Sequence, residues 1–364
     1  MSEEILKLKD VCEINGGYAF KSSNFKDSGV PIIRIGDISD NKVNISDTTV
    51  YIDADINDYE KFIINKGDIL IALSGATTGK FGIYNYDKNS LLNQRVAKLK
   101  PKSIVKNRYL YHYMNKLQED IYNSASGCAQ PNISPSEISE KNIYIPNMES
   151  QEKIVRVLDT AQELIDKRKE QIEALDELVK SQFIEMFGEY FDDKHLEELD
   201  TVSDKITDGE HGTVPRVEKG IPYLMARNIS VNNSLDFKEV SYIEQEVHEK
   251  IYSRCNPEQG YLLIVCVGAT IGKVALVPDM EEFSMARSVA LVKYDRAVIE
   301  GNYLLWLFNH NYMKSQLKNS SNESAQAGLY IGKIKKLKIP VPPIELQNQF
   351  ADFIKQVDKL KFEM

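Results

Sequence analysis

Long apolar runs and paired cysteines are missing from this 364-residue chain. No stretch approaches the roughly 18 to 20 apolar residues that cross a bilayer, and the charged N-terminus MSEEILKLKD lacks the apolar run of a secretory signal. The cysteines Cys12, Cys128, Cys255 and Cys266 are scattered singly, and none has a histidine beside it at zinc-ligand spacing. These absences predict a cytoplasmic protein with ordinary buried thiols and no metal site.

An excess of positive charge is also missing, because the formal net charge is −9 at pH 7. At first sight this argues against nucleic acid as a partner. The negative charge is concentrated, however. Residues 1–148 carry 18 Lys and Arg against 18 Asp and Glu, and residues 195–344 carry 17 against 19, whereas residues 149–194 carry 7 against 13. Two nearly balanced blocks are therefore joined by an acidic segment, and a balanced block can still present a basic face.

Catalytic motifs are not found either. The segment Gly75-Ala-Thr-Thr-Gly79-Lys80 is close to a phosphate-binding loop, but only three residues separate its glycines and no Ser or Thr follows its lysine. The hydroxyl that would hold magnesium is therefore missing. The segment Asn256-Pro-Glu-Gln lacks the second proline and the aromatic residue of an adenine methyltransferase loop. We expect a chain without a catalytic centre.

An internal repeat is the main positive feature of the sequence. Residues 66–84 and 259–277 match at eight positions with an offset of 193, including the whole Gly-Ala-Thr-x-Gly-Lys core. Residues 30–38 and 221–229 also correspond, and each block closes with an Ala-Gln pair, a short apolar strand and an Ile-Pro pair. Because the features follow in the same order, the sequence predicts two copies of one domain of roughly 150 residues.

Each block is expected to be rich in strands. Short β-branched runs, such as Pro31–Ile35 and Asp68–Leu73, are bounded by Gly, Asp and Asn. Apolar residues recur at intervals of three and four over Tyr109–Ile121 and Tyr303–Leu317, which predicts one helix per block. Each block is therefore predicted to be an α+β domain.

A long helix is predicted between the blocks. From Ser150, apolar or small residues follow a heptad ladder that no Pro or Gly interrupts before Gly188. Some 38 helical residues would span about 57 Å and form a rigid spacer, the alternative being a packing element within one globule. A second helix is predicted over Ile344–Phe362, and antiparallel pairing of the two is the simplest arrangement. The predicted pairing residues are Ile154, Leu158, Ala161, Ile165, Ile172, Leu175, Val179, Phe350, Ile354 and Val357.

The chain resembles the specificity subunit of a type I restriction-modification system. The resemblance is carried by the doubled Gly-Ala-Thr-x-Gly-Lys turn, by Ala325-Gln326, by Ser284–Ser288 and by the closing segment Ile339–Gln347 before a helix. These features, together with their duplication and the helix between them, cover nearly all of the chain.

The resemblance implies an α+β, pseudo-two-fold architecture of two mixed α/β target-recognition domains separated by long antiparallel, coiled-coil-like helices. The expected parts are domain 1 at residues 1–148, a spacer helix at 149–190, domain 2 at 195–343 and the start of a second spacer helix at 344–364. Each domain would read one half of an asymmetric, split site in double-stranded DNA.

The resemblance also implies that the chain catalyses nothing and binds no cofactor itself. Adenine methyltransferase subunits, which bring S-adenosylmethionine, would bind alongside, and a restriction or translocase subunit could join them. The competing reading of the same residues is a bivalent protein-interaction scaffold with two repeated ligand-binding domains on a helical spacer.

One departure from the family concerns the second spacer helix, which normally matches the first in length. Here only a short segment follows Pro343. We therefore expect the N-terminal half of the long helix, around Ile154, Leu158 and Ala161, to lack a partner within the chain. An exposed heptad seam is an association site, so a second protein chain, which could be another copy, is expected to cover it.

The residues that contact DNA should be polar or basic side chains on exposed loops, with Lys and Arg on phosphates. The candidates in domain 1 are Lys21, Arg34, Thr77, Thr78, Lys80, Asn93, Gln94, Arg95, Gln130 and Asn132. The candidates in domain 2 are His211, Thr213, Arg216, Arg227, Asn228, Thr270, Lys273, Arg287, Ser288 and Gln326. Any one of them could instead be an ordinary surface residue, and Arg34, Asn132 and Asn228 could be structural hydrogen-bonding residues.

Overall fold

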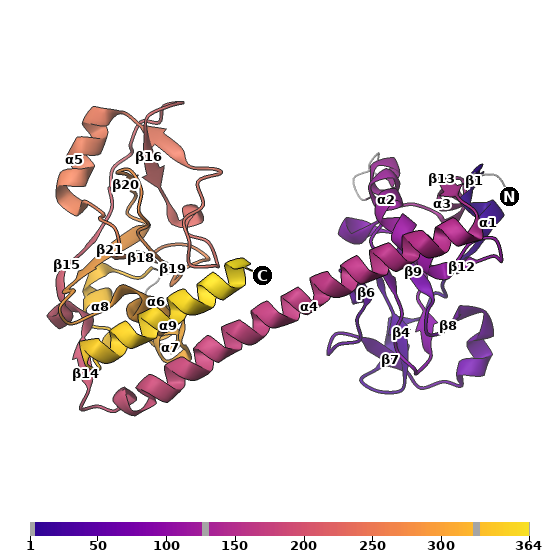
Figure 1. The fold of residues 1–364 in the computed structure, drawn as a ribbon, viewed down its shortest axis with the longest axis horizontal. Coiled ribbons are helices and arrows are strands. Elements are labelled where there is room, and N and C mark those ends of the chain that lie inside the picture. Colours follow the sequence, from indigo (N-terminus) through magenta and orange to yellow (C-terminus); the bar gives the residue numbers. More distant parts are fainter. Residues whose placement is uncertain (1–3, 126–130, 323–327, 364) are drawn as a thin grey trace. The chain divides into compact units, whose positions relative to one another are not determined.

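The computed structural model describes residues 4–125, 131–322 and 328–363. Packing divides the chain into two compact units, residues 1–167 (unit 1) and 168–364 (unit 2). The division falls inside one helix, α4 (Met148–Phe187), so each unit includes its own half of that helix (Figure 1). The predicted division into two recognition domains and two separate spacer helices is therefore a prediction about the roles of these segments, and packing alone does not test it. No described helix combines the length and the apolar character needed to cross a bilayer.

Unit 1 is built on two main sheets. The six-stranded sheet has the order β2 (Cys12–Gly16), β12 (Val96–Pro101), β9 (Ile69–Ala72), β10 (Phe81–Ile83), β6 (Asn41–Val43) and β5 (Ile38–Ser39). The five-stranded sheet has the order β3 (Phe25–Lys26), β7 (Val50–Ile52), β4 (Val30–Ile33), β11 (Ser90–Leu92) and β8 (Ile63–Ile64). Strands β4 and β11 are parallel, and a separate antiparallel pair joins β1 (Glu4–Lys7) to β13 (Asn142–Ile145).

The principal core of unit 1 lies between the six-stranded sheet and helix α2 (Asn107–Ala125). Apolar residues at three- and four-residue spacing place Leu110, Met114 and Leu117 on one buried face, where they belong to the same cluster as Ile71 and Phe81 of the sheet. The predicted helix over Tyr109–Ile121 is thus confirmed, with a few more residues at each end. Two short helices, α1 (Leu8–Val11) and α3 (Pro135–Ser139), complete the unit.

Unit 2 repeats this plan with fewer strands. One sheet has the order β15 (Ser203–Asp208), β21 (Val289–Tyr294), β18 (Leu262–Val265) and β19 (Val274–Leu276), and the other has the order β17 (Ser241–Ile243), β16 (Ile221–Leu224) and β20 (Ser284–Met285). Strand β14 (Leu196–Glu198) pairs with β22 (Lys338–Pro340), as β1 pairs with β13. The helices are α5 (Gln245–Cys255), α6 (Gly301–Asn309), α7 (Asn311–Asn322), α8 (Ile331–Lys335) and α9 (Ile344–Glu363).

The prediction of a single helix in each block is wrong for both units, because α1 and α3 accompany α2 in unit 1 and several helices form in unit 2. The segment Tyr303–Leu317 forms two helices, because His310 has an extended backbone (φ −73°, ψ 149°) and ends α6. Helix α5 was not predicted. Its buried residues Ile251 and Cys255 are four apart, a spacing that the sequence already contained.

The antiparallel pairing of the two long helices is confirmed within unit 2, where α9 lies along the C-terminal half of α4 (Figure 1). The ring of Phe350, near the start of α9, is 5.4 Å from that of Phe187, near the end of α4. At the other end of the pair, Lys361 Nζ is 2.6 Å from Asp176 Oδ1. The predicted pairing residues that meet in this core are Leu175, Val179, Phe350, Ile354 and Val357.

The prediction that the N-terminal half of α4 lacks a partner within the chain is wrong for Ile154 but is confirmed for Leu158 and Ala161, which are exposed. This half of the helix packs on α2 of unit 1, where Ile154 contacts the core. Asp159 accepts hydrogen bonds from Arg108 Nε (3.1 Å) and pairs with His112 Nε2 (2.7 Å). What remains exposed is a strip farther along the helix, which includes the predicted pairing residues Leu158, Ala161, Ile165 and Ile172.

A buried glutamine fastens the first turn of each of these helices to its own unit. Gln151 of α4 donates from Nε2 to the main-chain oxygens of Ile104 (3.0 Å) and Pro146 (2.9 Å), and its Oε1 accepts from the Lys106 N–H (2.9 Å). Both Gln151 and Gln347 of α9 are fully buried. Gln347 makes the same three bonds, with Val298 O (2.9 Å), Pro342 O (2.8 Å) and Glu300 N (2.9 Å). The repeat therefore extends to individual hydrogen bonds.

Candidate functional site

The predicted contact residues of unit 1 gather where several strands end at one edge. Strands β2 and β9 run in the same direction, because both are antiparallel to β12. Strands β4 and β11 are parallel to each other, and a parallel bridge between Tyr18 and Asn93 links the end of β2 to the end of β11. The loops that follow these four strands therefore lie at one edge. We call it the loop edge of unit 1, and it comprises residues 17–21, 34–37, 74–80, 93–95 and 131–132. The Gln94 N–H donates to Tyr18 O (2.9 Å), the Leu73 N–H to Arg95 O (2.9 Å) and the Gly75 N–H to Pro131 O (2.9 Å). These bonds make the loops one connected surface.

Unit 2 has a loop edge of the same construction, formed by residues 209–213, 225–228, 267–273, 286–288 and 328. The Arg287 N–H donates to Glu210 O (3.0 Å) and the Cys266 N–H donates to Ser288 O (2.8 Å). Ser288 also accepts a bond at its Oγ from the Ala226 N–H (3.2 Å). The repeat thus builds the same surface twice, once in each unit.

The repeated Gly-Ala-Thr-x-Gly-Lys turn packs against a helix. Gly79 has φ +83°, and a Cβ there would lie 3.2 Å from Gln118 O of α2; Gly272 has φ +87° and lies against Leu317 of α7. Glycine is required at both positions because other residues are strained there. Thr78 is buried and donates from Oγ1 to Gly75 O (2.8 Å) and Pro131 O (3.0 Å). The prediction that Thr78 contacts DNA is corrected, since this hydroxyl holds the turn together.

Two predicted base readers are also buried and structural. Asn228 accepts from the Met225 N–H at Oδ1 (3.0 Å) and donates to Asp236 O (3.0 Å), so it caps the short 3-10 turn η7 (Ala226–Asn228). In unit 1 the same place, in η2 (Ile35–Asp37), is taken by Asp37, and burial raises the pKa of its carboxyl. Asn93 is buried as well, and its Oδ1 accepts from the Arg95 N–H (3.5 Å) within the same turn. The predictions that Asn228 and Asn93 contact DNA are therefore corrected, since both side chains are buried.

Most of the other candidates are accessible on the loop edges. The exposed ones are Lys21, Lys80, Gln94, Arg95, Asn132, His211, Thr213, Arg216, Arg227 and Arg287. The half-buried ones are Arg34, Thr77, Thr270, Lys273 and Ser288. Gln130 and Gln326 lie outside the described residues.

Several of the accessible candidates are already held by the protein. Arg34 donates to Thr48 O (2.8 Å), Arg227 to Glu239 O (3.2 Å), and the Arg216 guanidinium lies over the Tyr223 ring at 4.1 Å. His211 Nε2 is 2.8 Å from Asp208 Oδ2. By contrast, five cations on the loop edges have side chains that pair with no other side chain among the described residues: Lys21, Lys80, Arg95, Lys273 and Arg287.

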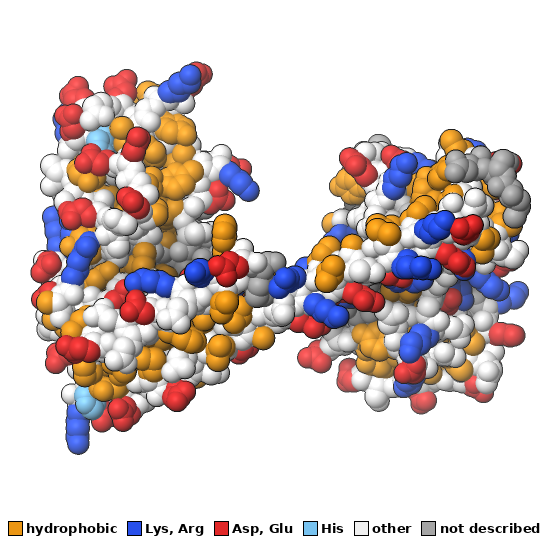
Figure 2. Space-filling view, in the orientation of Figure 1, with side chains coloured by type: hydrophobic (Ala, Val, Ile, Leu, Met, Phe, Trp, Pro, Cys, Tyr) orange, Lys and Arg blue, Asp and Glu red, His pale blue; other side chains and the backbone are white. Residues whose placement is uncertain are grey.

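Two residues of the loop edges were missed by the sequence analysis. Tyr18 is 42% exposed although it belongs to an aromatic cluster, and Glu210 stands at the corresponding place in unit 2. Only basic, amide, hydroxyl and imidazole side chains were taken as candidates, so an aromatic residue and an acidic residue were passed over. Charges of both signs are interspersed on the face of each unit shown in Figure 2, so no large patch of one sign lies there.

A buried histidine in unit 2 touches a serine and an acid, the residue types of a hydrolytic triad. His248 Nδ1 is 2.9 Å from Ser284 Oγ, and its Nε2 is 3.2 Å from Glu282 Oε2. Ser284 and His248 are 0% and 1% exposed, so a substrate carbonyl cannot reach the hydroxyl. The contact instead fastens α5 to β20.

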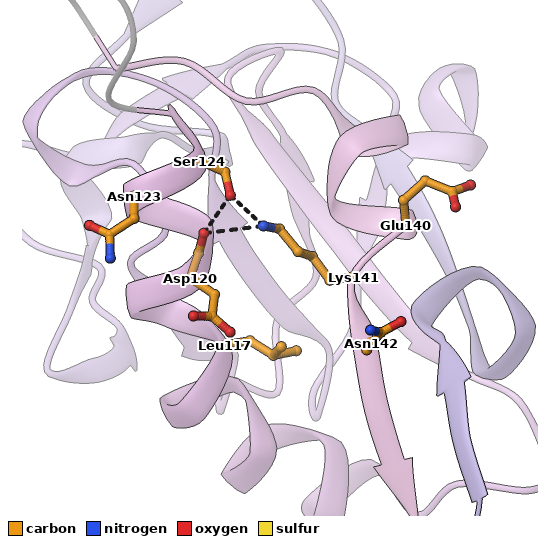
Figure 3. Close-up of a pocket in the computed structure, with 7 residues that line it drawn as sticks. All are labelled: Leu117, Asp120, Asn123, Ser124, Glu140, Lys141 and Asn142. Atoms are coloured by element: carbon orange, nitrogen blue, oxygen red, sulfur yellow. Dashed lines mark hydrogen bonds between the residues drawn. The ribbon is translucent and has the colours of Figure 1, made fainter.

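The buried thiols, and the residues that line the pocket in Figure 3, also have structural roles. Burial raises the pKa of Cys12 and of Cys266 to about 12, which keeps these thiols protonated and unreactive. The pocket, of about 490 Å³, lies at the end of α2 (Figure 3). There Lys141 Nζ points at α2 and donates to Asp120 O (3.1 Å) and to Ser124, so the lysine caps the last turn of the helix. The described residues contain no group of three or more His, Cys, Asp or Glu placed to hold a metal ion.

Comparison with known proteins connects this architecture to one family. A family model described as type I restriction modification DNA specificity domain matches residues 3–175 and 216–364. The type I restriction enzyme EcoBI specificity subunit of Escherichia coli is 24% identical over 97% of this chain and 78% of its own length. The MjaVIII specificity subunit of Methanocaldococcus jannaschii is 23% identical over 83% of this chain and 74% of its own. The crystal structure of a type I restriction-modification S subunit from M. genitalium has the same fold, with a TM-score of 0.60 and 17% identity over 100% of this chain and 91% of that one.

Proposed function

The chain belongs to the family of type I restriction-modification specificity subunits, and from this premise we propose that each unit reads one half of a two-part DNA site through its loop edge. The observation that carries the proposal is that two equivalent loop edges present cations with no partner among the described side chains. Unpaired Lys and Arg on turns suit DNA phosphates, while Arg and Gln reach base edges in the major groove. Because the side chains of the two edges differ, the two half-sites should differ in sequence.

The chemistry of DNA modification is proposed to reside on partner subunits. The serine, histidine and cysteines described above are committed to packing in this chain. We propose that adenine methyltransferase subunits, which carry S-adenosylmethionine, dock on the helices, and that a restriction or translocase subunit could add to the same assembly. The exposed apolar strip of α4 supports docking of a protein there, because exposed apolar residues at helical spacing are typical of association surfaces.

The test is long-read mapping of DNA methylation in cells that carry the partner methyltransferase gene, with and without the gene for this chain. We expect methylated adenines in a two-part motif, one in each half, only when this chain is present. An unchanged methylation pattern, with both proteins shown to be expressed and assembled, would overturn DNA reading. The protein-interaction scaffold would then be the better description.

A further inference from the structure

The most informative difference between the loop edges lies on a backbone frame that they share. In unit 1 the Gly17 N–H donates to Val96 O (3.1 Å) and the Tyr18 N–H donates to Leu92 O (2.8 Å). In the opposite direction, the Gln94 N–H donates to Tyr18 O (2.9 Å). A Cβ on Gly17 would lie 2.1 Å from the main chain of the 93–95 turn, so the two loops are in close contact.

Unit 2 forms the same three bonds. The Gly209 N–H donates to Val289 O (3.1 Å), the Glu210 N–H to Met285 O (2.9 Å) and the Arg287 N–H to Glu210 O (3.0 Å). Gly209 makes an equally close approach, with a Cβ placed 2.1 Å from Met285 O. Three side-chain positions are therefore equivalent: Tyr18, Gln94 and Arg95 in unit 1 correspond to Glu210, Arg287 and Ser288 in unit 2.

The Tyr18 ring is held in place but is not covered. Its centroid is 4.9 Å from that of Phe20, 5.4 Å from that of Tyr59 and 5.3 Å from that of Phe62. These three rings fix its orientation, and yet 42% of the residue stays exposed, beside the exposed Gln94. The Tyr18 ring therefore offers a fixed, partly exposed apolar surface beside polar side chains, and such a surface suits contact with another apolar group. In the DNA major groove that group is the thymine methyl.

The equivalent side chain in unit 2 is an oriented acid. Glu210 Oε1 accepts from the Gly212 N–H (2.8 Å), and its Oε2 is 3.6 Å from Arg254 NH2. A carboxylate facing DNA is repelled by phosphates, so it gains binding energy only by accepting a hydrogen bond. The amino group of cytosine is the major-groove donor that Glu and Asp recognise.

We infer that Tyr18 and Glu210 are equivalent specificity-determining residues, Tyr18 contacting a thymine methyl in one half-site and Glu210 accepting from a cytosine amino group in the other. The inference rests on the proposed function, because it presupposes that both loop edges meet DNA. It adds the base class that each edge selects and the two residues that select it.

The experiment uses the full chain assembled with its methyltransferase subunits and a pool of DNA duplexes randomised at both half-sites. Bound duplexes are selected and sequenced for the wild type and for Glu210→Gln, Tyr18→Phe and Tyr18→Ala. Glu246→Gln, which changes an exposed acid on α5, is the matched control. Thermal melting of each assembly and binding to one scrambled duplex are measured in parallel.

Glu210→Gln should lower the preference for cytosine at one position of the second half-site by about tenfold and leave the first half-site unchanged. Tyr18→Phe should keep the thymine preference at one position of the first half-site, because the ring is retained, whereas Tyr18→Ala should lose it. The control should leave both half-sites unchanged.

Two results would overturn the assignment of Glu210: unchanged base preferences, or binding that rises equally for all sequences because a repelling charge has been removed. Loss of the thymine preference in Tyr18→Phe would overturn the apolar contact, since only the hydroxyl is then missing. A wild-type assembly that selects a two-part site which none of the variants alters refutes this inference alone. A wild type that selects no sequence at all refutes the proposed function as well.

Discussion

At the scale of single residues, the repeated lysine is the clearest candidate for a phosphate contact. Lys80 is exposed and Lys273 half-buried, and each follows a glycine that anchors the turn to a helix. In unit 1, Gly79 and the buried Thr78 fix the turn below Lys80. In unit 2, Gly272 packs against Leu317 and fixes the turn below Lys273. A charge held in this way contacts the DNA backbone whatever the base sequence.

Replacing Lys80 or Lys273 with Ala should weaken binding to all DNA sequences alike. Loss of one phosphate contact should also reduce the slope of log K against log salt concentration by about one unit. The measurement is a salt titration of binding to specific and scrambled duplexes, with Lys250→Ala on α5 as the control. A change in the preferred bases, rather than in overall affinity, would show that the phosphate assignment is wrong.

The residues that the sequence predicted incorrectly share one physical cause. Thr78, Asn93 and Asn228 have the side-chain types of DNA contacts, but Ser, Thr and Asn on turns also bond to the nearby backbone. Which of the two they do depends on tertiary packing, such as the packing of α2 on the Gly79 turn, and this is not encoded in local spacing. Tyr18 and Glu210 were missed for the opposite reason, because residue type alone removed them from consideration.

At the scale of elements, the sequence predicted best where apolar periodicity is long. The long helix was predicted at 149–190 and lies at Met148–Phe187, and the second was predicted at 344–362 and lies at Ile344–Glu363. The break between α6 and α7 at His310 could not be predicted, because neither Pro nor Gly marks it and the apolar spacing continues across it. Likewise, the docking of α4 on α2 depends on polar contacts of Asp159 that periodicity does not reveal.

The buried glutamines should each make a large contribution to the stability of one unit. Gln151→Ala leaves two carbonyl oxygens and one N–H, which are buried or partly buried, without partners, so unit 1 should lose about 3 kcal/mol of unfolding free energy. Gln347→Ala should destabilise unit 2 similarly. Urea unfolding, with hydrogen exchange to assign the loss to a unit, measures both. The exposed Gln349→Ala on α9 is the control, and an equal effect of control and test variants would contradict the role of the clamps.

The docking of α4 on α2 should weaken in acid. Although partial burial of Asp159 acts in the opposite direction, hydrogen bonds from Arg108 and His112 hold the pKa of its carboxyl below the usual range. A depressed pKa contributes stability above the ordinary value of about 3.9, and this contribution disappears as the pH falls toward the depressed pKa. Since Asp159 is partly exposed, we expect a loss of about 1 kcal/mol.

The measurement for Asp159 is urea unfolding of unit 1 at a series of pH values between 7 and 3, for the wild type and for Asp159→Asn. The variant should be less stable than the wild type at pH 7, and the difference should shrink as the pH falls below about 4. A difference that stays constant over this range would show that Asp159 does not carry the pH dependence.

At the scale of the whole molecule, two units share one plan of strands, loop edges and helix clamps, as the internal repeat predicted. The exposed apolar strip of α4 belongs to neither of the cores into which the ends of this helix pack. Within unit 1 it includes Val157, Leu158, Leu164 and Ile165, which are between 40% and 68% exposed. Fully burying an exposed Val, Leu or Ile side chain is worth about 1.5 to 3 kcal/mol, so covering several of these half-exposed side chains together favours association with another protein chain.

Self-association through this strip is expected in the absence of partner subunits. Light scattering over a range of concentrations should show oligomers, and Leu158→Glu or Ile165→Glu should weaken their formation by at least about tenfold, or 1.4 kcal/mol. Val231→Glu, at another exposed apolar residue, should have no effect. A strict monomer at high concentration with unchanged helicity would contradict this expectation.

The frame shared by the two loop edges also bears on how such a protein can diverge over generations. The three main-chain bonds at Tyr18 are repeated at Glu210, although one residue is an aromatic in a cluster of rings and the other is an acid. Main-chain bonds do not depend on side-chain identity, so a mutation at these positions alters recognition without a folding penalty from the frame. One domain can therefore acquire a new sequence preference while the other keeps the old one. The change of specificity does not require a destabilised intermediate sequence.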